Sequence, residues 1–415
     1  MKPGIFILVA LALLAGCTST TSEDHMPIID NLNETADLQP VDTAKTVGGN
    51  NRFAVDFYSM VSDRDENIFF SPFSFSSALA MTYEGAKGTT ASEMESALHL
   101  DSNSASRRAA FAGLNSELNA PGKNFTLSVA NALWVQNDYR LLPDYTQVAG
   151  IAYSARVSNL DFARDSEGSR QTINSWVEDK THDKITNLIP QGVLTPGTRL
   201  VLTNAIYFKG SWKDQFDKSL TMEEDFRAPG KTVKAQMMRR TGRGAGYNYA
   251  EVDGIQILEM PYSGDELSMI VVLPEQGKLA EAERSLKSFE DWRAQLSMQR
   301  VDVYFPRFRM ETQYFASGEL KKLGMKSAFD TSADFSGIDG SRGLYIQAVI
   351  HKAFVEVNEE GTEAAAATAV VVGITSIGVE KPIPVFRADR PFIFMIYHKK
   401  SGSILFMGRV SDPSR

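Results

Sequence analysis

The chain has very little cysteine: Cys17 is the only one among its 415 residues. An intramolecular disulfide is therefore impossible, and a cysteine-based zinc site cannot be assembled. The five histidines are widely separated, and none shows the i, i+4 spacing of a helical metal site. We therefore expect neither a metal nor another cofactor. Stability must come from packing. Hydrophobic residues make up 43% of the chain and provide ample material for it.

The chain also lacks an excess of positive charge, since 51 acidic residues outnumber 43 Lys and Arg and the formal net charge is -8. Proteins that bind nucleic acids use clustered Lys and Arg side chains to displace counterions, so this composition excludes nucleic acid as a partner. No linker-like interruption divides the long central stretch of the sequence. We therefore predict one large domain, over residues 48–415. We also expect the protein to be a monomer.

The usual catalytic signatures are absent. The sequence contains no G-x-S-x-G nucleophile elbow, no P-loop, and no G-x-G-x-x-G after a predicted strand. The best enzyme hypothesis is a hydrolase that uses His351 as a base, with a serine and a carboxylate that the sequence does not identify. The competing interpretation is a hydrogen-bonded core histidine beside strand residues, and we favour it. The protein is not expected to be an enzyme.

The N-terminus contains an apolar run from Ile5 to Ala15. A membrane-spanning helix needs about 20 apolar residues, so this run better suits the core of a signal peptide. It ends in Leu14-Ala15-Gly16-Cys17, which resembles the lipobox of prokaryotic lipoproteins. The resemblance implies that residues 1–17 are a lipoprotein signal and that Cys17 is lipidated, with an ordinary secretory signal as the alternative. We expect an extracytoplasmic protein, lipid-anchored to a membrane or secreted.

Residues 18–47 are rich in Thr, Ser, Asp, Glu and Asn, which predicts a flexible tether. Helical spacing dominates the following third of the chain, where Phe53, Phe57 and Met60 recur on one face. Thr90 to Glu93 fits a capping box at the start of another helix. Helices are predicted over residues 50–61, after 74, and over 90–98, 107–119, 144–152, 169–181, 279–296 and 314–323.

Strand patterns dominate the C-terminal half. Residues 199–208 read RLVLTNAIYF, a nearly continuous apolar run that is typical of a central strand buried on both faces. Further strands are predicted over 127–135, 255–260, 268–273, 301–308, 348–357, 392–397 and 404–407. Helices early and strands late, without regular βαβ alternation, indicate an α+β fold with large sheets.

The most unusual segment follows the predicted strand 348–357 and reads EEGTEAAAATAVVV from Glu359. Alanine favours a helix, which Thr362 could cap. Gly361 and the β-branched residues at the far end weaken that interpretation. The alternative is a segment that is a loop in one state and a strand in another.

Read with a period of two, one face of this segment contains only small or apolar side chains. Its members are Thr362, Ala364, Ala366, Thr368, Val370 and Val372. A strand that enters the middle of an existing sheet must pass close-packed neighbours, so bulky or charged inward groups would clash or be desolvated. Glu363, the only charged residue between Thr362 and Val372, falls on the other face. The pattern therefore suits a strand that must insert. A permanently paired strand would be better served by larger residues such as Val, Ile or Tyr.

The same segment, E-E-G-T-E-A-A-A-A-T, resembles the hinge of inhibitory serpins. Other stretches agree: N-I-F-F-S-P-F-S from Asn67, T-N-A-I-Y-F-K-G-S-W from Thr203, I-H-K-A from Ile350, D-R-P-F from Asp389 and F-M-G-R-V from Phe406. The resemblance covers residues 48–412. It implies a fold with about three β-sheets, eight to nine helices and an exposed reactive loop near residues 361–387.

By this resemblance the protein is a protease inhibitor that acts as a suicide substrate. The loop is cleaved by the target, and its hinge side inserts into the central sheet while the protease is still acylated. The hinge comprises Glu359, Glu360, Gly361, Thr362, Ala364, Ala366 and Thr368. The sheet opens around Ser71, Ser74, Asn204 and His351, with Trp212 near the point where insertion starts.

The resemblance places the scissile bond between Thr375 and Ser376, within a window from Ile374 to Ile377. This window contains no Arg or Lys, which favours an elastase-like or subtilisin-like serine protease as partner and leaves a cysteine protease as an alternative. The second functional hypothesis is a non-inhibitory serpin that acts as a binding or carrier protein. Such a protein would be expected to carry bulky, charged or proline residues on the inward face of the hinge, which here has none.

Overall fold

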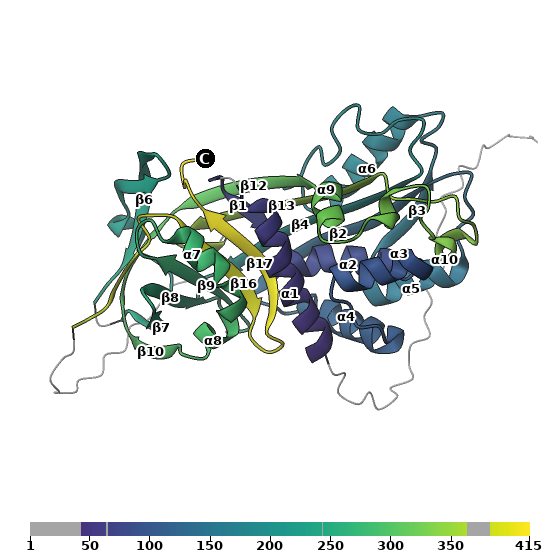
Figure 1. Ribbon diagram of the computed structural model, residues 1–415. Coiled ribbons are helices and arrows are strands. Elements are labelled where there is room, and N and C mark those ends of the chain that lie inside the picture. The colour runs from purple at the N-terminus through teal and green to yellow at the C-terminus, as the bar shows by residue number, and fades with distance from the viewer. Residues whose placement is uncertain (1–42, 64, 243, 363–381) are drawn as a thin grey trace, which may run out of the picture. The chain divides into compact units, whose positions relative to one another are not determined.

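In the described part of the chain, helices predominate as far as Lys180, and strands predominate over helices in the remainder (Figure 1). The computed structural model describes residues 43–63, 65–242, 244–362 and 382–415. The predicted α+β class with three sheets is confirmed. Within the described ranges no helix is both long enough and apolar enough to cross a membrane.

The described residues form ten α-helices, where eight or nine were expected. They are α1 (Ala44–Val61), α2 (Pro72–Tyr83), α3 (Gly88–Ala97), α4 (Ser104–Leu118), α5 (Pro143–Tyr153), α6 (Ser166–Lys180), α7 (Leu279–Arg284), α8 (Phe289–Arg293), α9 (Ser317–Lys322) and α10 (Ser336–Asp339). Part of the difference is α10, a single turn that was not predicted. The rest comes from residues 279–296, where one predicted helix is two.

In the C-terminal half, both predicted helices differ from the structure in their extent. Between α7 and α8 the chain forms a 3₁₀ turn at Leu286–Ser288, and the Ser285 hydroxyl donates to the carbonyl of Glu281 at 3.1 Å. Serine competes for backbone hydrogen bonds in this way and favours helix ends. The helix predicted over 314–323 begins only at Ser317, because Tyr314 and Phe315 pair with strand residues His351 and Ile350. Cross-strand pairing here overrides the helical spacing.

Helix α1 begins at Ala44, so residues 44–47 of the range expected as a tether belong to a helix. Val47 is buried in the main hydrophobic core, which explains why the helix starts this early. Strand β17 (Ser403–Val410) is far from α1 in the sequence but lies beside it in the fold (Figure 1). The Asn50 amide donates to the carbonyl of Ile404 at 3.0 Å and fixes this contact.

The six-stranded sheet has the order β12-β13-β14-β4-β2-β3, and β13 also pairs directly with β4. The predicted strand 199–208 is its centre and is buried on both faces, as expected. The strands are β2 (Phe125–Gln136), β3 (Arg156–Leu160), β4 (Leu200–Ser211), β12 (Phe308–Phe315), β13 (Ala348–Asn358) and β14 (Gly361–Thr362).

The other two sheets contain seven and four strands. The seven-stranded sheet has the order β1-β17-β16-β9-β8-β7-β10, where β1 is Ile68–Phe70, β7 Gly246–Val252, β8 Ile255–Pro261, β9 Leu267–Pro274, β10 Ser297–Arg300 and β16 Phe392–His398. The four-stranded sheet has the order β15-β11-β6-β5, where β5 is Met222–Ala228, β6 Lys231–Arg240, β11 Asp302–Pro306 and β15 Val385–Arg387. The single strand predicted over 301–308 is thus divided at Arg307 between two sheets. Pro306 offers no N–H to continue the ladder.

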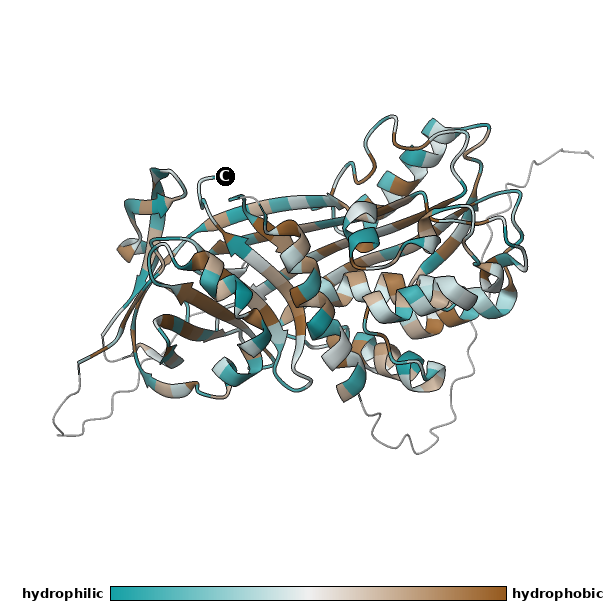
Figure 2. Ribbon diagram, viewed as in Figure 1, coloured by the Kyte–Doolittle hydropathy of each residue, from teal (hydrophilic) through white to brown (hydrophobic). Residues whose placement is uncertain are grey.

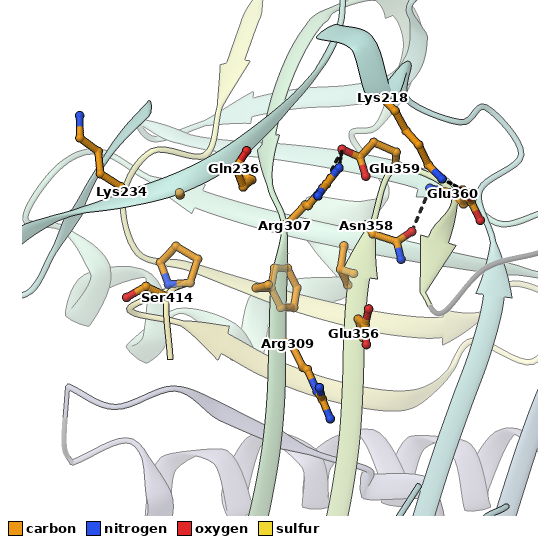
Figure 3. A pocket seen from close by; sticks show the side chains of 14 residues that line it. Lys218, Lys234, Gln236, Arg307, Arg309, Glu356, Asn358, Glu359, Glu360 and Ser414 are labelled. Atoms are coloured by element: carbon orange, nitrogen blue, oxygen red, sulfur yellow. Dashed lines mark hydrogen bonds and ion pairs between the residues drawn. The ribbon is translucent and has the colours of Figure 1, made fainter. Parts of the chain in front are cut away.

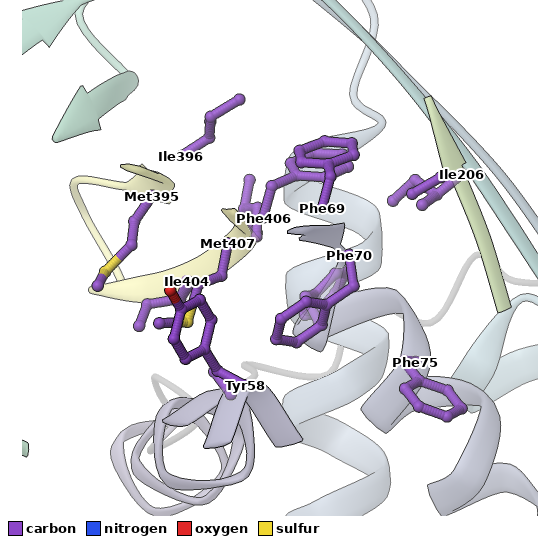
Figure 4. Close-up of a cluster of buried hydrophobic side chains, with 14 of the residues drawn as sticks. Tyr58, Phe69, Phe70, Phe75, Ile206, Met395, Ile396, Ile404, Phe406 and Met407 are labelled. Atoms are coloured by element: carbon purple, nitrogen blue, oxygen red, sulfur yellow. The ribbon is translucent and has the colours of Figure 1, made fainter. Parts of the chain in front are cut away.

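The main core lies between the six-stranded and seven-stranded sheets and the helices α1 and α2. In the seven-stranded sheet, strand β9 is almost wholly hydrophobic, and all of its residues are buried (Figure 2). Phe69 of β1 stacks on Phe406 of β17, with ring centroids 5.3 Å apart (Figure 4). A second core lies on the other face of the six-stranded sheet, where Ile173 and Val177 of α6 cover it. Both faces of that sheet are therefore closely packed.

Candidate functional site

Strands β4 and β13 of the six-stranded sheet run parallel and meet along a boundary that we call the seam. Their residues pair directly from Val201 with Ala348 as far as Tyr207 with Phe354. Beyond that point the short strand β14 lies between them and is antiparallel to both. Thr362 is paired with Gly210 on one side and with Val357 on the other. The seam is therefore closed at its Leu200 end, and the hinge residues Gly361 and Thr362 occupy it at its Ser211 end.

Gly361 is required by this close approach. A Cβ at this position would lie 2.2 Å from the carbonyl oxygen of Gly210 and 2.6 Å from Cα of Ser211. The residue also has a φ of 151°, a conformation that residues with side chains rarely adopt. Any side chain here would push the hinge away from β4.

Thr362 turns its side chain into the main core and is fully buried. Its hydroxyl shares a hydrogen bond with the Tyr262 hydroxyl at 2.8 Å. Burial raises the pKa of the Tyr262 phenol well above its usual range, so this group stays protonated. Trp212 stacks on Tyr262 with ring centroids 4.6 Å apart, and its backbone N–H donates to the carbonyl of Glu360 at 2.9 Å. The first inward-facing hinge position is thus held by an aromatic pair.

The two hinge glutamates are bound differently. The Glu359 side chain is 1% exposed and pairs with Arg307, whose Nε donates at 2.7 Å, and with the Thr221 hydroxyl. Burial alone would raise the pKa of the Glu359 carboxyl, but these hydrogen bonds outweigh it and hold the pKa below its usual range. Glu360 forms an ion pair with the exposed Lys218.

These two ion pairs border an open cavity of 610 Å³ between β6, β12, β13 and the C-terminal residues. Arg307 and Glu359 point toward each other on one side of it, and Lys218 points toward Glu360 (Figure 3). The cavity therefore gives solvent access to the place where the hinge enters the sheet.

A second group of predicted residues meets in the middle of the seam. His351 of β13 and Asn204 of β4 are paired, and the ring nitrogen Nδ1 bonds to the Asn204 side-chain oxygen. The Asn204 amide donates to the Ser74 hydroxyl at 2.5 Å and to the Asn131 side-chain oxygen. These polar groups are fully buried or nearly so, and they connect the seam to α2 and β2.

The hydrogen bonds of His351 define its protonation. The backbone N–H of Ser71 donates to Nε2 at 3.1 Å, so Nε2 carries no proton, and Nδ1 must be the donor to Asn204. Burial lowers the pKa of this imidazole to about 3, so it is neutral at physiological pH. The ring is stacked on Phe75 with centroids 5.0 Å apart. A histidine held in this way is a structural connector rather than an accessible base.

Ser71 caps α2 as well as contacting His351. Its hydroxyl accepts the backbone N–H of Ser74 at 3.1 Å and donates to the carbonyl of Leu405 at 2.6 Å. Pro72 then occupies the first helical position, where its missing N–H costs nothing. One serine thus joins a helix start, the seam and the seven-stranded sheet.

The structure therefore brings the predicted site residues together in two places. Trp212, Glu359, Glu360, Gly361 and Thr362 gather at the Ser211 end of the seam, and Ser71, Ser74, Asn204 and His351 gather at its middle. The predicted residues Cys17, Ala364, Ala366, Thr368, Thr375 and Ser376 lie outside the described residues.

Sequence reasoning missed several residues of the site: Asn131, Thr221, Tyr262 and Arg307. Asn131 could have been noticed as a polar residue inside the predicted strand 127–135. The other three come from separate parts of the chain, and no local pattern marks them.

The family model described as serpin (serine protease inhibitor) matches residues 48–413 of this chain. The chain is a serpin. It is 42% identical, over 88% of its length and 84% of the relative's, to an uncharacterised serpin-like protein of Thermococcus kodakarensis. It is 40% identical to human leukocyte elastase inhibitor, over 88% of this chain and 98% of that protein.

Solved structures agree with this assignment of the fold. Human thyroxine-binding globulin, in complex with thyroxine, superimposes with a TM-score of 0.80 at 31% identity, covering 89% of this serpin and 99% of that chain. The relatives of this serpin thus include one protein named as a protease inhibitor and one named for binding a small molecule.

Proposed function

We propose that this serpin inhibits an elastase-like or subtilisin-like serine protease as a suicide substrate. The observation that carries the proposal is the position of β14. Two hinge residues already lie between the parallel strands β4 and β13, antiparallel to both, at the end where an additional strand would enter. The described part of the hinge is thus in register for insertion.

The register extends along the seam without a shift. Each residue beyond Thr362 would pair with the next residue of β4 and β13, which places Thr368 between Asn204 and His351. Side chains alternate, so Ala364, Ala366 and Thr368 would share the inward face of Thr362. Their small size suits passage between packed strands. Thr368 would offer its hydroxyl to the polar groups that now close the middle of the seam.

Insertion is favourable because it replaces the single ladder between β4 and β13 with two ladders, one on each side of the new strand. Each residue that enters between β4 and β13 gives its backbone N–H and C=O groups partners within the sheet, worth about 1 kcal/mol per hydrogen bond. The intact protein is then metastable relative to the cleaved one. A protease that is still acylated when the loop inserts is carried along, and its active site is distorted.

We propose that the scissile bond is Thr375–Ser376, within residues 374–377, as the resemblance to the family implies. The lack of Arg and Lys there supports a protease that accepts small or β-branched residues. The similarity to leukocyte elastase inhibitor supports the same class. A cysteine protease is the other target class that the loop sequence permits.

The direct experiment is incubation with a panel of serine proteases, including elastase-like, subtilisin-like and trypsin-like enzymes, followed by denaturing gel electrophoresis. We expect a covalent complex, stable in detergent, with an elastase-like or subtilisin-like enzyme. N-terminal sequencing of the released peptide should begin at Ser376. Complete cleavage by every enzyme without a stable complex would contradict inhibition.

A carrier function is the second candidate, favoured by the similarity to thyroxine-binding globulin. This serpin has a cavity of 670 Å³ bordered by α1, α8 and the turn between β16 and β17. A carrier would not need a small inward face on its hinge, whereas Thr362 is small and already buried in the sheet. The same protease panel separates the two functions, since a carrier would be cleaved without trapping the enzyme.

Catalysis is not part of the proposal. His351, the only base that the sequence suggested for a hydrolase, is fully buried and its two ring nitrogens are occupied by Ser71 and Asn204. A general base must reach the proton that it removes from a substrate. We expect no turnover of small esters or peptides by this protein.

The lipoprotein assignment is also a proposal. The L-A-G-C sequence supports processing before Cys17 and lipidation of its thiol, with the serpin domain held outside a membrane. The test is labelling of expressing cells with a fatty acid and recovery of the protein from the membrane fraction. Cys17→Ser should abolish both the label and the membrane association; label retained in that variant would contradict the proposal.

A further inference from the structure

Residues 218–224, which we call the bridging segment, contact the chain on both sides of the reactive loop. The segment comprises a 3₁₀ turn and the start of β5. Before the loop, the Thr221 hydroxyl donates to the carboxylate of Glu359. After the loop, the Glu224 carboxylate pairs with Arg387 of β15 at 2.5 Å. The bridging segment therefore joins the two ends of the loop.

Two large apolar side chains of the bridging segment are exposed to solvent. Leu220 is 48% exposed and Met222 is 55% exposed. Among the described residues six large hydrophobic side chains are exposed, and a third member of this set, Val385, lies on β15 at the other end of the loop. A single exposed apolar residue is ordinary on a protein surface. Here, half of the set is gathered at the two ends of one loop.

Met222 and Val385 belong to the same face of the four-stranded sheet. Residues that pair across strands, and residues two apart along a strand, share a face. In order across the sheet this face contains Met222 of β5, Arg239 of β6, Tyr304 of β11, and Val385 and Arg387 of β15. Leu220 lies beside β6, in the turn before β5. We call these six residues the loop-end face.

The middle of the loop-end face is already ordered. The Arg387 guanidinium lies over the Tyr304 ring at 3.8 Å from its centroid, and that of Arg239 lies at 5.7 Å. Glu224 pairs with both arginines, and Asp302, which is paired with Val385, adds a second negative charge. Tyr, Arg and Met are enriched in protein interfaces, and side chains that are ordered before binding lose little entropy on binding.

The length of the loop determines which partner comes close to this face. Val385 is about ten residues from the proposed scissile bond, and an extended chain of that length spans at most about 35 Å. A protease domain of about 250 residues has a radius of gyration of about 18 Å, and so a diameter of about 45 Å. The body of a protease that holds the loop in its active site is therefore within reach of the loop-end face.

We propose that the loop-end face is a docking surface for the body of the target protease, separate from the contact that the reactive loop makes with the active site. The inference rests on the proposed inhibitory function and adds a second contact to it. Because Glu224 and Asp302 balance the charges of Arg239 and Arg387, the complementary patch on the protease is apolar rather than charged. Such a contact selects among proteases whose active sites accept the same loop sequence.

The test measures the second-order rate constant for attack on the loop, by trapping or by cleavage, with the elastase-like and the subtilisin-like protease of the panel. Met222→Gln and the double variant Leu220→Gln/Met222→Gln keep the size of the side chains and remove their apolar character. Both positions are exposed, so the melting temperature should stay that of wild type. We expect the rate for the trapped protease to fall about threefold in the single variant and about tenfold in the double variant.

The matched control is Ile151→Gln. Ile151 is 66% exposed on α5, which belongs to the helical part of the chain and contacts neither end of the loop. Its rate constant should equal that of wild type. The amount of inhibitor consumed per protease trapped should also be unchanged in all three variants, because none alters the hinge.

The outcomes separate the docking surface from the inhibitory function. If wild type traps a protease and the double variant reacts with it equally fast, the loop-end face is not a docking surface, and the inhibitory function stands. If wild type traps no protease, both are overturned.

Two further results would assign the effect elsewhere. An equal fall with both proteases would mean that the substitutions change the presentation of the loop, since the two enzymes have unrelated surfaces, and would overturn the docking surface. An unchanged rate combined with lost self-association, measured by analytical ultracentrifugation, would assign the loop-end face to a second copy of this chain and overturn the proposal as well. A fall that is confined to one protease supports it.

Discussion

The seven-stranded sheet and the seam of the six-stranded sheet are built from different interactions. In the seven-stranded sheet every neighbouring pair of strands is antiparallel, and every residue of β9, β16 and β17 is buried. Stacked rings such as Phe69 of β1 and Phe406 of β17 pack neighbouring strands of this sheet against each other. In the seam, the parallel strands are joined at the middle by side-chain hydrogen bonds of His351 and Asn204.

The difference matters because the two kinds of interaction respond differently to a new strand. Apolar packing is lost when neighbours separate, and the lost contacts are not replaced. Buried hydrogen bonds can be exchanged for new ones if the incoming strand supplies polar groups, as Thr368 would. On the proposed mechanism, the seven-stranded sheet stays fixed, and the seam opens because it is closed by exchangeable bonds. The predictions that follow test this contrast, beginning with the largest effect.

The largest effect is expected from Thr362→Arg. The Thr362 side chain is buried against Tyr262, and an unpaired guanidinium group there would cost several kcal/mol. Each 1.4 kcal/mol corresponds to about a tenfold change in rate, so insertion should lose to hydrolysis and the variant should become a substrate. We expect the yield of covalent complex, measured on denaturing gels, to fall at least about tenfold. Trapping at the native ratio would show that Thr362 is not the leading inward position.

Phe406→Ala should destabilise the fixed sheet by about 3–5 kcal/mol, because it removes a buried ring and leaves a cavity. Since this sheet is the same in both states, the intact and the cleaved protein should be destabilised alike, as measured by chemical unfolding. A much smaller effect on the cleaved form would mean that the seven-stranded sheet also rearranges.

His351→Gln tests the exchangeable bonds through pH. The folded-state pKa of His351 is about 3, below the usual value near 6.5, so the unfolded chain binds the extra proton first as the pH falls. This residue therefore costs stability progressively below pH 6.5, about 2 kcal/mol between pH 7.5 and pH 5. The urea concentration at the midpoint of unfolding should fall more for wild type than for His351→Gln as the pH is lowered from 7.5 to 5. Parallel pH profiles would mean that another group governs the acid sensitivity.

Lys218→Ala should have the smallest effect. Its partner is Glu360, but the Lys218 side chain is 63% exposed, and such surface ion pairs contribute about 0–1 kcal/mol. We expect inhibition within twofold of wild type, measured as inhibitor consumed per protease trapped. A large loss of inhibition would mean that Lys218 takes part in the hinge mechanism. Its exposed ion pair would then be as important as the pair between Arg307 and the buried Glu359.

The fold could be predicted well where the pattern was long and apolar. The run 199–208 predicted a strand buried on both faces, and β4 has one face in each core. Prediction failed where tertiary pairing decided the outcome. Tyr314 has helical spacing but pairs with His351, and the exposed, polar hairpin of β5 and β6 gave no apolar pattern to detect.

The site was predicted by family resemblance rather than by spacing. Ser71, Asn204 and His351 are far apart in the sequence, and only a known arrangement could group them. Gln347 shows the limit of that approach. Gln347 is one polar residue among many in the sequence. Its three hydrogen bonds across the seam become visible only when β4 and β13 are placed side by side.

The most direct test of the proposed metastability of the intact protein is a comparison with protein that has been cleaved once, at residues 374–377, by a protease that is not trapped. Thermal unfolding of the two forms should show the nicked protein melting well above the intact one, because the freed hinge adds a strand that pairs with both β4 and β13. A nicked protein that melts at or below the intact one would contradict the account.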